Sequence, residues 1–437
     1  MGGSYAGLSA FLVGTGETDG SGSGCWIRVN SPLDAIHTEW AGHDVTGVND
    51  STASVNACIN KFGSARPIRI SPGTLKISFP TTYQYHELFN VARKTAFVIN
   101  AKNNLTIFAE NDVNINTDGG GESERVCFGV IGCSNFSFSG LNSIRHAQTF
   151  RPGQKTQLSS RRKIGSVSHG TWHGKSINNH FVDPISLQSR VGPWGVRKSM
   201  TITGDTKSGG GIFVEIGGTS GPVAPQYVTI TNCVSDGAIN ADGTQSTHIL
   251  IIGDEGDYAT SFNSIRIINN TLRGGYRAIQ DYNVGLLGKK ATGLVIEDNN
   301  LDRSDRVTIT SSAWGGTVYR NNKTHIQFGN QGCIIAGQYP TISGNDFDST
   351  SLLAANLGYR IDGANVENNN FSNNLSNPIS RVMDWDSFAA MTYRNNRYIG
   401  LTGVDVFRGE ADIIQCGWKH SDATAGLTSK PTDIYPG

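Results

Sequence analysis

The sequence lacks long apolar runs, closely spaced cysteines and a charge bias, and each absence argues against a class of protein. Every apolar run is far shorter than the ~20 residues that a membrane-spanning helix needs, and residues 1–20 show no basic stretch followed by an apolar core. The seven cysteines include no C-x-x-C pair, which argues against a zinc site and a disulfide framework. Lys plus Arg and Asp plus Glu both number 36, so net charge favours neither nucleic acid nor a membrane surface as a partner.

Motifs for nucleotides and for common hydrolases are also missing. The chain has no Gly-rich phosphate loop, no dinucleotide fingerprint and no G-x-S-x-G nucleophile elbow. We therefore expect neither a cofactor nor a bound metal. What the chain has instead is 54 glycines and only 16% charged residues, a composition typical of turn-rich β architecture rather than of helical bundles.

A short motif repeats through the second half of the chain. It begins with an apolar residue, continues with two adjacent Asn, Asp or Gly positions and usually ends on an apolar residue, as in IINNTL (267–272) and VENNNF (366–371). The second polar position is always Asn, and these asparagines follow one another at intervals of 23 to 29 residues: Asn270, Asn299, Asn322, Asn345, Asn369 and Asn396. A sustained period of this size indicates a solenoid.

The segments between these asparagines are short, alternating and rich in β-branched residues, as in RVTIT (306–310). Because none has helix-length periodicity, leucine-rich and helical repeats are excluded and a parallel β-helix with three short strands per coil remains. Asn suits its corners, since Asn tolerates the left-handed backbone and stacked Asn side chains can hydrogen-bond from coil to coil.

One helix is predicted ahead of the coils. Asp50 or Ser51 can cap a helix of about three turns over residues 51–62. Its mostly apolar face comprises Ala53, Val55, Ala57, Ile59 and Phe62. The next segment, PIRISPGTLKIS (67–78), is typical of a strand, a tight turn and a second strand. Because the first coil of a solenoid exposes an open core, we expect the helix to cap it.

This segment resembles the opening of pectate-lyase-like right-handed β-helices, especially those of bacteriophage tailspikes and capsule depolymerases. Such proteins open with Asp-x-x-Gly-x-x-Asp-(Ser/Thr)-Thr-Ala, a capping helix and a Pro-Gly-Thr turn. The matching residues here are Asp44, Gly47, Asp50, Ser51, Thr52, Ala53, Pro72, Gly73 and Thr74. The match covers roughly 60 residues, and beyond it only the rhythm of the coils is similar.

The resemblance implies an all-β protein, a right-handed single-stranded parallel β-helix, that forms a homotrimer on a phage tail. Such a protein is made in the host cytoplasm and acts outside the cell on a bacterial capsular or O-antigen polysaccharide. Its other partner would be the phage tail or baseplate, and neither nucleic acid nor membrane insertion is implied. The expected regions are 1–24 as a linker or remnant of a virion-anchoring region, 25–45 as a neck, 46–420 as the β-helix and 421–437 as a C-terminal tail.

The resemblance carries over no catalytic residues, so these must come from the chain itself. Glycosidic hydrolysis needs two carboxyl groups, ~5–5.5 Å apart for retention or ~6.5–9.5 Å for inversion. If segments 211–218, 248–255 and 275–282 stack with Val214, Ile251 and Ala278 inward, then Glu215, Asp254 and Asp281 share an outward face. Asp254 and Asp281 would lie ~5 Å apart and Glu215 ~8 Å from Asp254. We predict these three as catalytic, the alternative being that the two aspartates only cap turns.

Charged and aromatic residues near this face are predicted to bind substrate, because a pyranose ring presents apolar C–H groups to an aromatic surface. They are Glu255, Arg277, Tyr282, Arg303, Asp305, Arg306 and Trp314. For Trp314 the alternative is packing in a trimer interface.

Residues 145–198 carry ten Lys or Arg against one acid, Asp183. They interrupt the coil rhythm, so we expect a basic excursion that attracts an acidic glycan, or else an ordinary solvated face. His169 and His173 within it could serve a lyase as bases. The favoured function is thus a depolymerase that hydrolyses a surface polysaccharide. The alternatives are a polysaccharide lyase acting on a uronate-containing glycan and a receptor-binding spike without catalysis.

Overall fold

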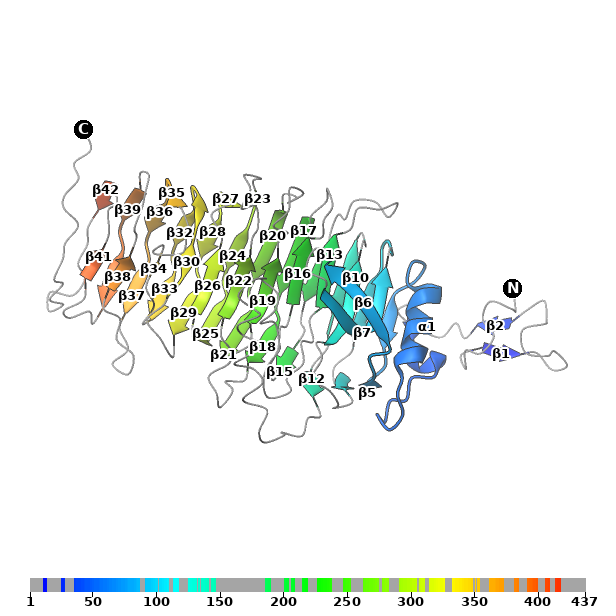
Figure 1. Cartoon of the computed structure of the whole chain (residues 1–437). Helices are drawn as coiled ribbons and strands as arrows, with labels where there is room; N and C mark the ends of the chain where they lie inside the picture. Colours follow the sequence, from blue (N-terminus) through cyan, green and yellow to red (C-terminus); the bar gives the residue numbers. More distant parts are fainter. Residues whose placement is uncertain are drawn as a thin grey trace.

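Short strands wind into an elongated stack of coils that starts at one helix (Figure 1). The computed structural model describes residues 11–13, 25–27 and 35–417, apart from segments that connect strands. These segments are 87–90, 118–124, 147–184, 190–199, 209–213, 219–225, 238–246, 253–261, 283–290, 327–331, 354–360, 373–380, 385–390, 400–404 and 409–412, with further gaps of three residues or fewer.

Each coil contributes a strand to each of three faces, and the strands that pair along a face do so in parallel. The exception is β6 (Thr81–His86), which pairs antiparallel with β7 (Val91–Asn100) at one end of the third face. The first face contains β4 (Ile68–Ile70), β8 (Thr106–Ala109), β11 (Phe136–Ser139), β14 (Met200–Thr203), β17 (Gln226–Thr231), β20 (Asn263–Ile268), β24 (Val295–Glu297), β28 (Val318–Arg320), β32 (Thr341–Ser343), β36 (Asn365–Glu367), β39 (Met391–Arg394) and β42 (Ile413–Gly417). Short strands extend it: β3 (Ile36–His37), β23 (Ala291–Thr292), β27 (Trp314–Gly315), β31 (Gly337–Gln338) and β35 (Ile361–Asp362).

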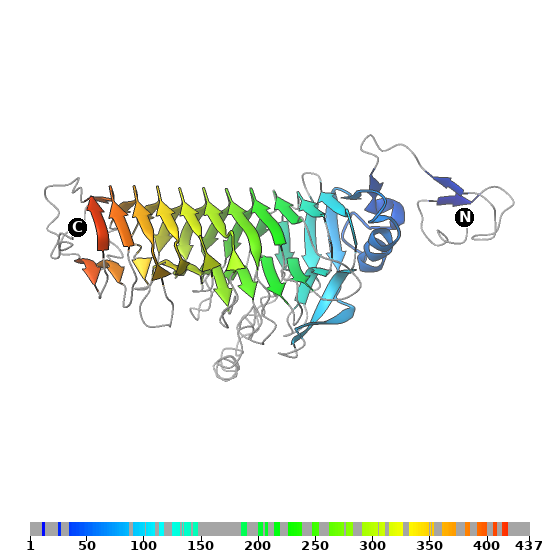
Figure 2. The same cartoon turned by 90° about the horizontal axis from the view of Figure 1, so that it is seen from above.

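The second face consists of β5 (Gly73–Ile77), β9 (Val113–Thr117), β12 (Ser143–His146), β15 (Thr206–Ser208), β18 (Val234–Gly237), β21 (Thr271–Gly274), β25 (Asn300–Ser304), β29 (Lys323–Ile326), β33 (Asp346–Asp348), β37 (Asn370–Ser372) and β40 (Arg397–Ile399). The third consists of β7 (Val91–Asn100), β10 (Arg125–Ile131), β13 (Ile185–Ser189), β16 (Val214–Gly218), β19 (Thr247–Ile252), β22 (Arg277–Tyr282), β26 (Arg306–Thr310), β30 (Ile334–Ile335), β34 (Leu352–Leu353), β38 (Arg381–Asp384) and β41 (Asp405–Arg408). Seen from above, the strands stand side by side along the stack (Figure 2). The predicted parallel β-helix is confirmed.

Two local expectations need adjustment. β1 (Phe11–Val13) pairs antiparallel with β2 (Cys25–Ile27), although no regular structure was expected within 1–24. β13 lies within the segment 145–198 and pairs with β10 and β16, so at least this part of the expected excursion belongs to a coil. The His169–His173 pair lies outside the described residues. No helix among the described residues is long and apolar enough to cross a membrane.

The predicted cap is the helix α1 (Thr52–Phe62), which follows the 3-10 helix η2 (Thr38–Ala41). Asp50 begins it, because its carboxylate accepts hydrogen bonds from the backbone N–H of Thr52 at 2.9 Å and from the Thr52 hydroxyl at 2.6 Å. The buried face is Thr52, Val55, Cys58, Ile59 and Phe62, so Ala53, which is exposed, was wrongly placed on it. The helix covers the open end of the core, as Figure 1 shows.

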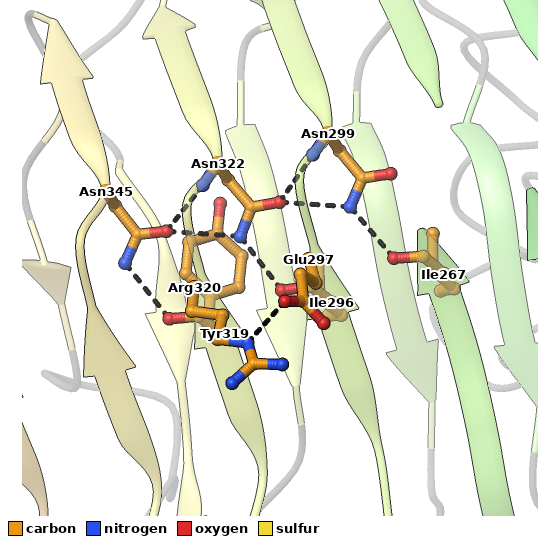
Figure 3. A network of polar contacts seen from close by, with 8 residues as sticks. All are labelled: Ile267, Ile296, Glu297, Asn299, Tyr319, Arg320, Asn322 and Asn345. Carbon is orange, nitrogen blue, oxygen red and sulfur yellow. Dashed lines mark hydrogen bonds and ion pairs between the residues drawn. The ribbon is translucent and has the colours of Figure 1, made fainter. Parts of the chain in front are cut away.

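The six repeated asparagines form a buried ladder at the corner between the first and second faces, and Figure 3 shows three of them, Asn299, Asn322 and Asn345. The backbone N–H and the side-chain Nδ2 of each donate to Oδ1 of the next at 2.9–3.1 Å. Nδ2 also donates to a backbone carbonyl on the first face at 2.9–3.0 Å. The residue before each ladder asparagine, such as Asn321 with φ 55°, takes the left-handed backbone. The predicted ladder is confirmed. The left-handed backbone and the coil-to-coil hydrogen bonds belong to two adjacent residues rather than to one.

Inside the later coils, aromatic rings repeat on one column of the second face. Phe347, Phe371 and Tyr398 stack there with ring centroids 5.0 and 5.7 Å apart and planes within 12°. Tyr319 of the first face stacks on Phe347 with centroids 6.2 Å apart. The five cysteines whose side chains are described are buried thiols and not disulfides, as the scattered spacing of the cysteines predicts.

Candidate functional site

The predicted carboxylate cluster rested on an alignment of three strands that the structure changes. Val214 pairs with Ile249, and Ile249 pairs with Ile279. The predicted stacking of Ile251 on Ala278 is therefore wrong by three residues, because Ile251 pairs with Asp281. An odd shift exchanges the inward and outward faces of a strand.

Asp281 consequently faces the core rather than solvent. It is 2% exposed, and its carboxylate accepts a hydrogen bond from the indole N–H of Trp314, which is fully buried. Neither the outward position predicted for Asp281 nor the sugar-stacking role predicted for Trp314 is possible in this arrangement. The trimer-interface alternative for Trp314 fails for the same reason, since its side chain packs inside one chain.

The other predicted residues fall in three groups. Arg277 begins β22, where its backbone is in register with Thr247 and Arg306 on the neighbouring strands. Because it is only 8% exposed, it has little surface for a sugar. Four predicted residues lie on described strands and have no described side-chain surroundings: Glu215, Tyr282, Arg303 and Arg306. Three lie outside the described residues: Asp254, Glu255 and Asp305.

A different set of charged side chains is brought together on the second face. Each of its later strands starts just after a ladder asparagine, and its middle residue points into the core: Leu272, Leu301, Thr324, Phe347, Phe371 and Tyr398. Because side chains alternate along a strand, the residue after each of these points outward. Register places these six outward residues in one line, which ends at the exposed Ile399. We call the five polar ones the charge column: Arg273, Asp302, His325, Asp348 and Ser372.

Side chains in the charge column contact one another from coil to coil. His325 Nδ1 lies 2.9 Å from Asp302 Oδ1, and His325 Nε2 lies 3.9 Å from Asp348 Oδ2. The Ser372 hydroxyl donates to Asp348 Oδ1 at 3.4 Å. The side chains of Asp302, His325 and Asp348 are 23%, 31% and 42% exposed, so all three are accessible from outside.

The two ring nitrogens of His325 face different carboxyl groups. Nδ1 of the ring is within hydrogen-bond distance of Asp302, and Nε2 lies on the side of Asp348. Asp302 and Asp348 are two coils apart, about 10 Å between backbones at ~4.8 Å per coil. Both side chains turn toward His325, whose imidazole lies between the two carboxyl groups. Within the described part of the chain no group of three metal-binding side chains is arranged to hold an ion.

The sequence contained the signal that locates the charge column. Every member lies three residues after a ladder asparagine: Asn270 precedes Arg273, Asn299 precedes Asp302, Asn322 precedes His325, Asn345 precedes Asp348 and Asn369 precedes Ser372. Aligning the coils on these asparagines, instead of on segments from a less regular part of the chain, reveals the charge column directly.

Comparison with known proteins supports the fold. No protein-family profile matches the chain, and no curated protein matches its sequence. Among solved structures, the surface protein and adhesin PfbA of Streptococcus pneumoniae aligns with a TM-score of 0.60 and 12% identity over 90% of this chain and 98% of its own. The A-module of the mannuronan C-5 epimerase AlgE6 of Azotobacter vinelandii aligns with a TM-score of 0.51 and 11% identity over 91% and 100%.

A tailspike of the E. coli bacteriophage HK620 also aligns, over 96% of this chain and 68% of its own, with 12% identity and a TM-score of 0.45, which is too low to support a closer relation. At these identities the similarity concerns the fold alone. The chain therefore has the right-handed parallel β-helix of the pectate-lyase-like type, with a column of accessible acidic and basic side chains along its second face.

Proposed function

We propose that the protein binds an extended polysaccharide along its second face and cleaves it by hydrolysis at the charge column. The observation that carries this proposal is the pair of accessible carboxyl groups, Asp302 and Asp348, that converge on His325 from two coils apart. A β-helix suits such a ligand, because its coils repeat the same outward positions at a constant spacing along one direction.

The contacts suggest separate roles for the two carboxyl groups. Asp302 lies within hydrogen-bond distance of His325 Nδ1, so it is the candidate base that takes a proton from the attacking water. Asp348 is the more exposed of the two and has Ser372 and the Nε2 side of His325 as neighbours. It is the candidate acid that protonates the departing glycosidic oxygen, as inversion requires.

The finer proposal is that the polysaccharide is a bacterial capsule or O-antigen and that the protein is a trimeric tailspike depolymerase. It is supported by the capping segment, where Asp44, Asp50 and the Pro-Gly-Thr turn match such spikes, and by a helix-capped β-helix of the expected kind. The predicted catalytic roles of Glu215 and Asp254 remain a competing proposal for the same reaction.

Oligosaccharide release from capsule and lipopolysaccharide preparations of a panel of bacteria tests the reaction. We expect fragments that have gained one water, read by mass spectrometry. Asp302→Asn and Asp348→Asn should each lower turnover by about 100-fold or more. Asp346→Asn is the matched control, because Asp346 is exposed on the same strand, two residues from Asp348 and outside the charge column, and its turnover should change by less than about threefold.

The same assay distinguishes two alternatives, a lyase and a receptor-binding spike without catalysis. His325 Nε2 is a base oriented by Asp302, which favours proton abstraction beside a uronate carboxylate as the second chemistry. A lyase of that kind would release fragments one water lighter, with a new ultraviolet absorbance. Binding to a preparation without any release, unchanged in all three variants, would overturn cleavage and leave a receptor-binding spike.

A further inference from the structure

Two tyrosines break a conformational rule at the corner that begins the first face. Tyr227 and Tyr339 have φ angles of 55° and 53°, a left-handed backbone in which bulky residues are rare outliers. Both are also among the few exposed large hydrophobic side chains in the described chain, at 51% and 69%. A strained backbone that presents an aromatic ring to solvent is a reason to look for function.

The coils bring these tyrosines into one line. Register aligns Tyr227, Ser264, Gly293, Gly316, Tyr339 and Gly363 on successive coils, a set that we call the tyrosine ridge. All six have a positive φ. Tyr227 and Tyr339 are four coils apart, about 19 Å at ~4.8 Å per coil, and the positions between them carry only a serine and two glycines.

The stretch between the rings carries no large side chain and is open at Gly316. A Cβ added at Gly316 would meet no atom within 4 Å, so space above the backbone is free there. An extended chain of pyranose units can therefore lie along the ridge from one ring to the other.

The ring of Tyr339 lies against the next coil. A Cβ added at Gly363 would fall 2.4 Å from Cδ1 and 2.6 Å from Cε1 of the Tyr339 ring, so the ring rests on the glycine backbone. Any larger residue at 363 would displace it. A ring that is supported on one side loses less conformational entropy when a ligand stacks on it than a ring that is free on all sides.

From these observations we infer that the tyrosine ridge is a second saccharide-binding site, which takes extended pyranose glycans by stacking on Tyr227 and Tyr339. An aromatic face carries partial negative charge, which suits the C–H groups of a pyranose ring. The site is separate from the charge column, because the ridge lies on the first face, at or just before the start of its main strands, whereas the column lies on the second face, after those strands have ended. It depends on the polysaccharide ligand of the proposed function and not on cleavage.

Tyr339→Asn and Tyr227→Asn test the ridge on a microarray of pyranose oligosaccharides and bacterial polysaccharides, both neutral and uronate-containing. Asn is compatible with the left-handed backbone, and the chain itself has Asn104 and Asn135 at this corner in earlier coils. We expect binding to fall at least about 10-fold in each variant, while Tyr339→Phe, which keeps the ring, stays within about threefold. The melting temperature of the Asn variants should be equal to or above that of the parent.

Several results would overturn glycan binding at the tyrosine ridge. Unchanged glycan binding in the Asn variants, a melting temperature that falls with binding, or a parent protein that binds no glycan on the array would each do so. A changed oligomeric state in sedimentation with unchanged glycan binding would assign the ridge to contact with a second copy and also overturn the inference. Binding is measured again in Asp302→Asn, so that loss of cleavage with retained, tyrosine-dependent binding leaves the ridge standing while the depolymerase proposal is judged alone.

Discussion

The earlier and later coils of the molecule hold their interiors together in different ways. From Asn270 to Asn396 one residue type repeats at the corner and forms an unbroken hydrogen-bonded ladder. At the equivalent position one coil earlier stands Cys233, whose backbone N–H donates to Asn270 Oδ1 at 3.0 Å. Where the coil length is nearly constant, identical side chains stack on one another and each repeat stabilises the next.

The core shows the same contrast. In the later coils Phe347 and Phe371 stack nearly parallel, with planes 12° apart. In the earlier coils Phe128 contacts Phe97 at 4.8 Å with planes tilted by 35°, and Phe138 at 4.7 Å edge-on. The earlier coils thus depend on individual fits between unlike neighbours, whereas the later ones depend on repetition.

The largest expected effect comes from removing the centre of the earlier cluster. Phe128→Ala should lower the free energy of unfolding by about 3–5 kcal/mol, because a fully buried ring leaves a cavity beneath two other aromatic rings. Hydrogen exchange would show whether protection is lost first in β7, β10 and β11. Equal loss over the later coils would contradict the division into two regions.

Breaking the ladder should have the next largest effect. Asn322→Ala removes an acceptor for the backbone N–H of Asn299 and a donor to the carbonyl of Ile296. Leaving such buried groups unsatisfied should cost about 2–4 kcal/mol in total. The matched control is Asn300→Ala, an exposed asparagine at the start of β25, which should change stability by less than about 0.5 kcal/mol. Equal losses in thermal or chemical denaturation would show that the ladder contributes nothing.

Acid should weaken the cap next to the earlier coils. Burial alone would raise the pKa of Asp50, but hydrogen bonds from Ser78 and Thr52 outweigh it and lower the pKa. A lowered folded-state pKa contributes stability that is present above the unfolded value, about 3.9, and is lost as the pH falls from there toward the folded value.

The melting temperature should therefore decrease when the pH is lowered below about 4. The decrease should be smaller than that caused by Phe128→Ala or Asn322→Ala. Asp50→Asn should flatten this dependence, and a profile that Asp50→Asn leaves unchanged would show that other carboxyl groups are responsible.

The two regions also differ in what the sequence reveals. The recurrence of Asn322 and its equivalents at intervals of 23 to 29 residues was enough to predict the β-helix, the ladder and where the later coils turn. The strand alignment behind Asp281 failed, because β16, β19 and β22 belong to coils whose lengths differ and spacing no longer fixes register there. Trp314 was misplaced for a related reason: a tryptophan next to acids suits a sugar site, but nothing local shows that both face inward.

The smallest expected loss of stability comes from an ion pair on the outer surface of the later coils. Arg394 Nε lies 2.5 Å from Glu367 Oε2, and their side chains are 49% and 18% exposed. Because solvent and salt screen such pairs, Arg394→Ala should cost only about 0.2–1 kcal/mol, and the difference from the parent should shrink as salt is added. Urea denaturation at low and high salt measures both. If Arg394→Ala cost as much as Asn322→Ala, ion pairs outside the coils would hold the repeat in register. A smaller, salt-sensitive loss would leave that role to the asparagines, which water and salt do not reach.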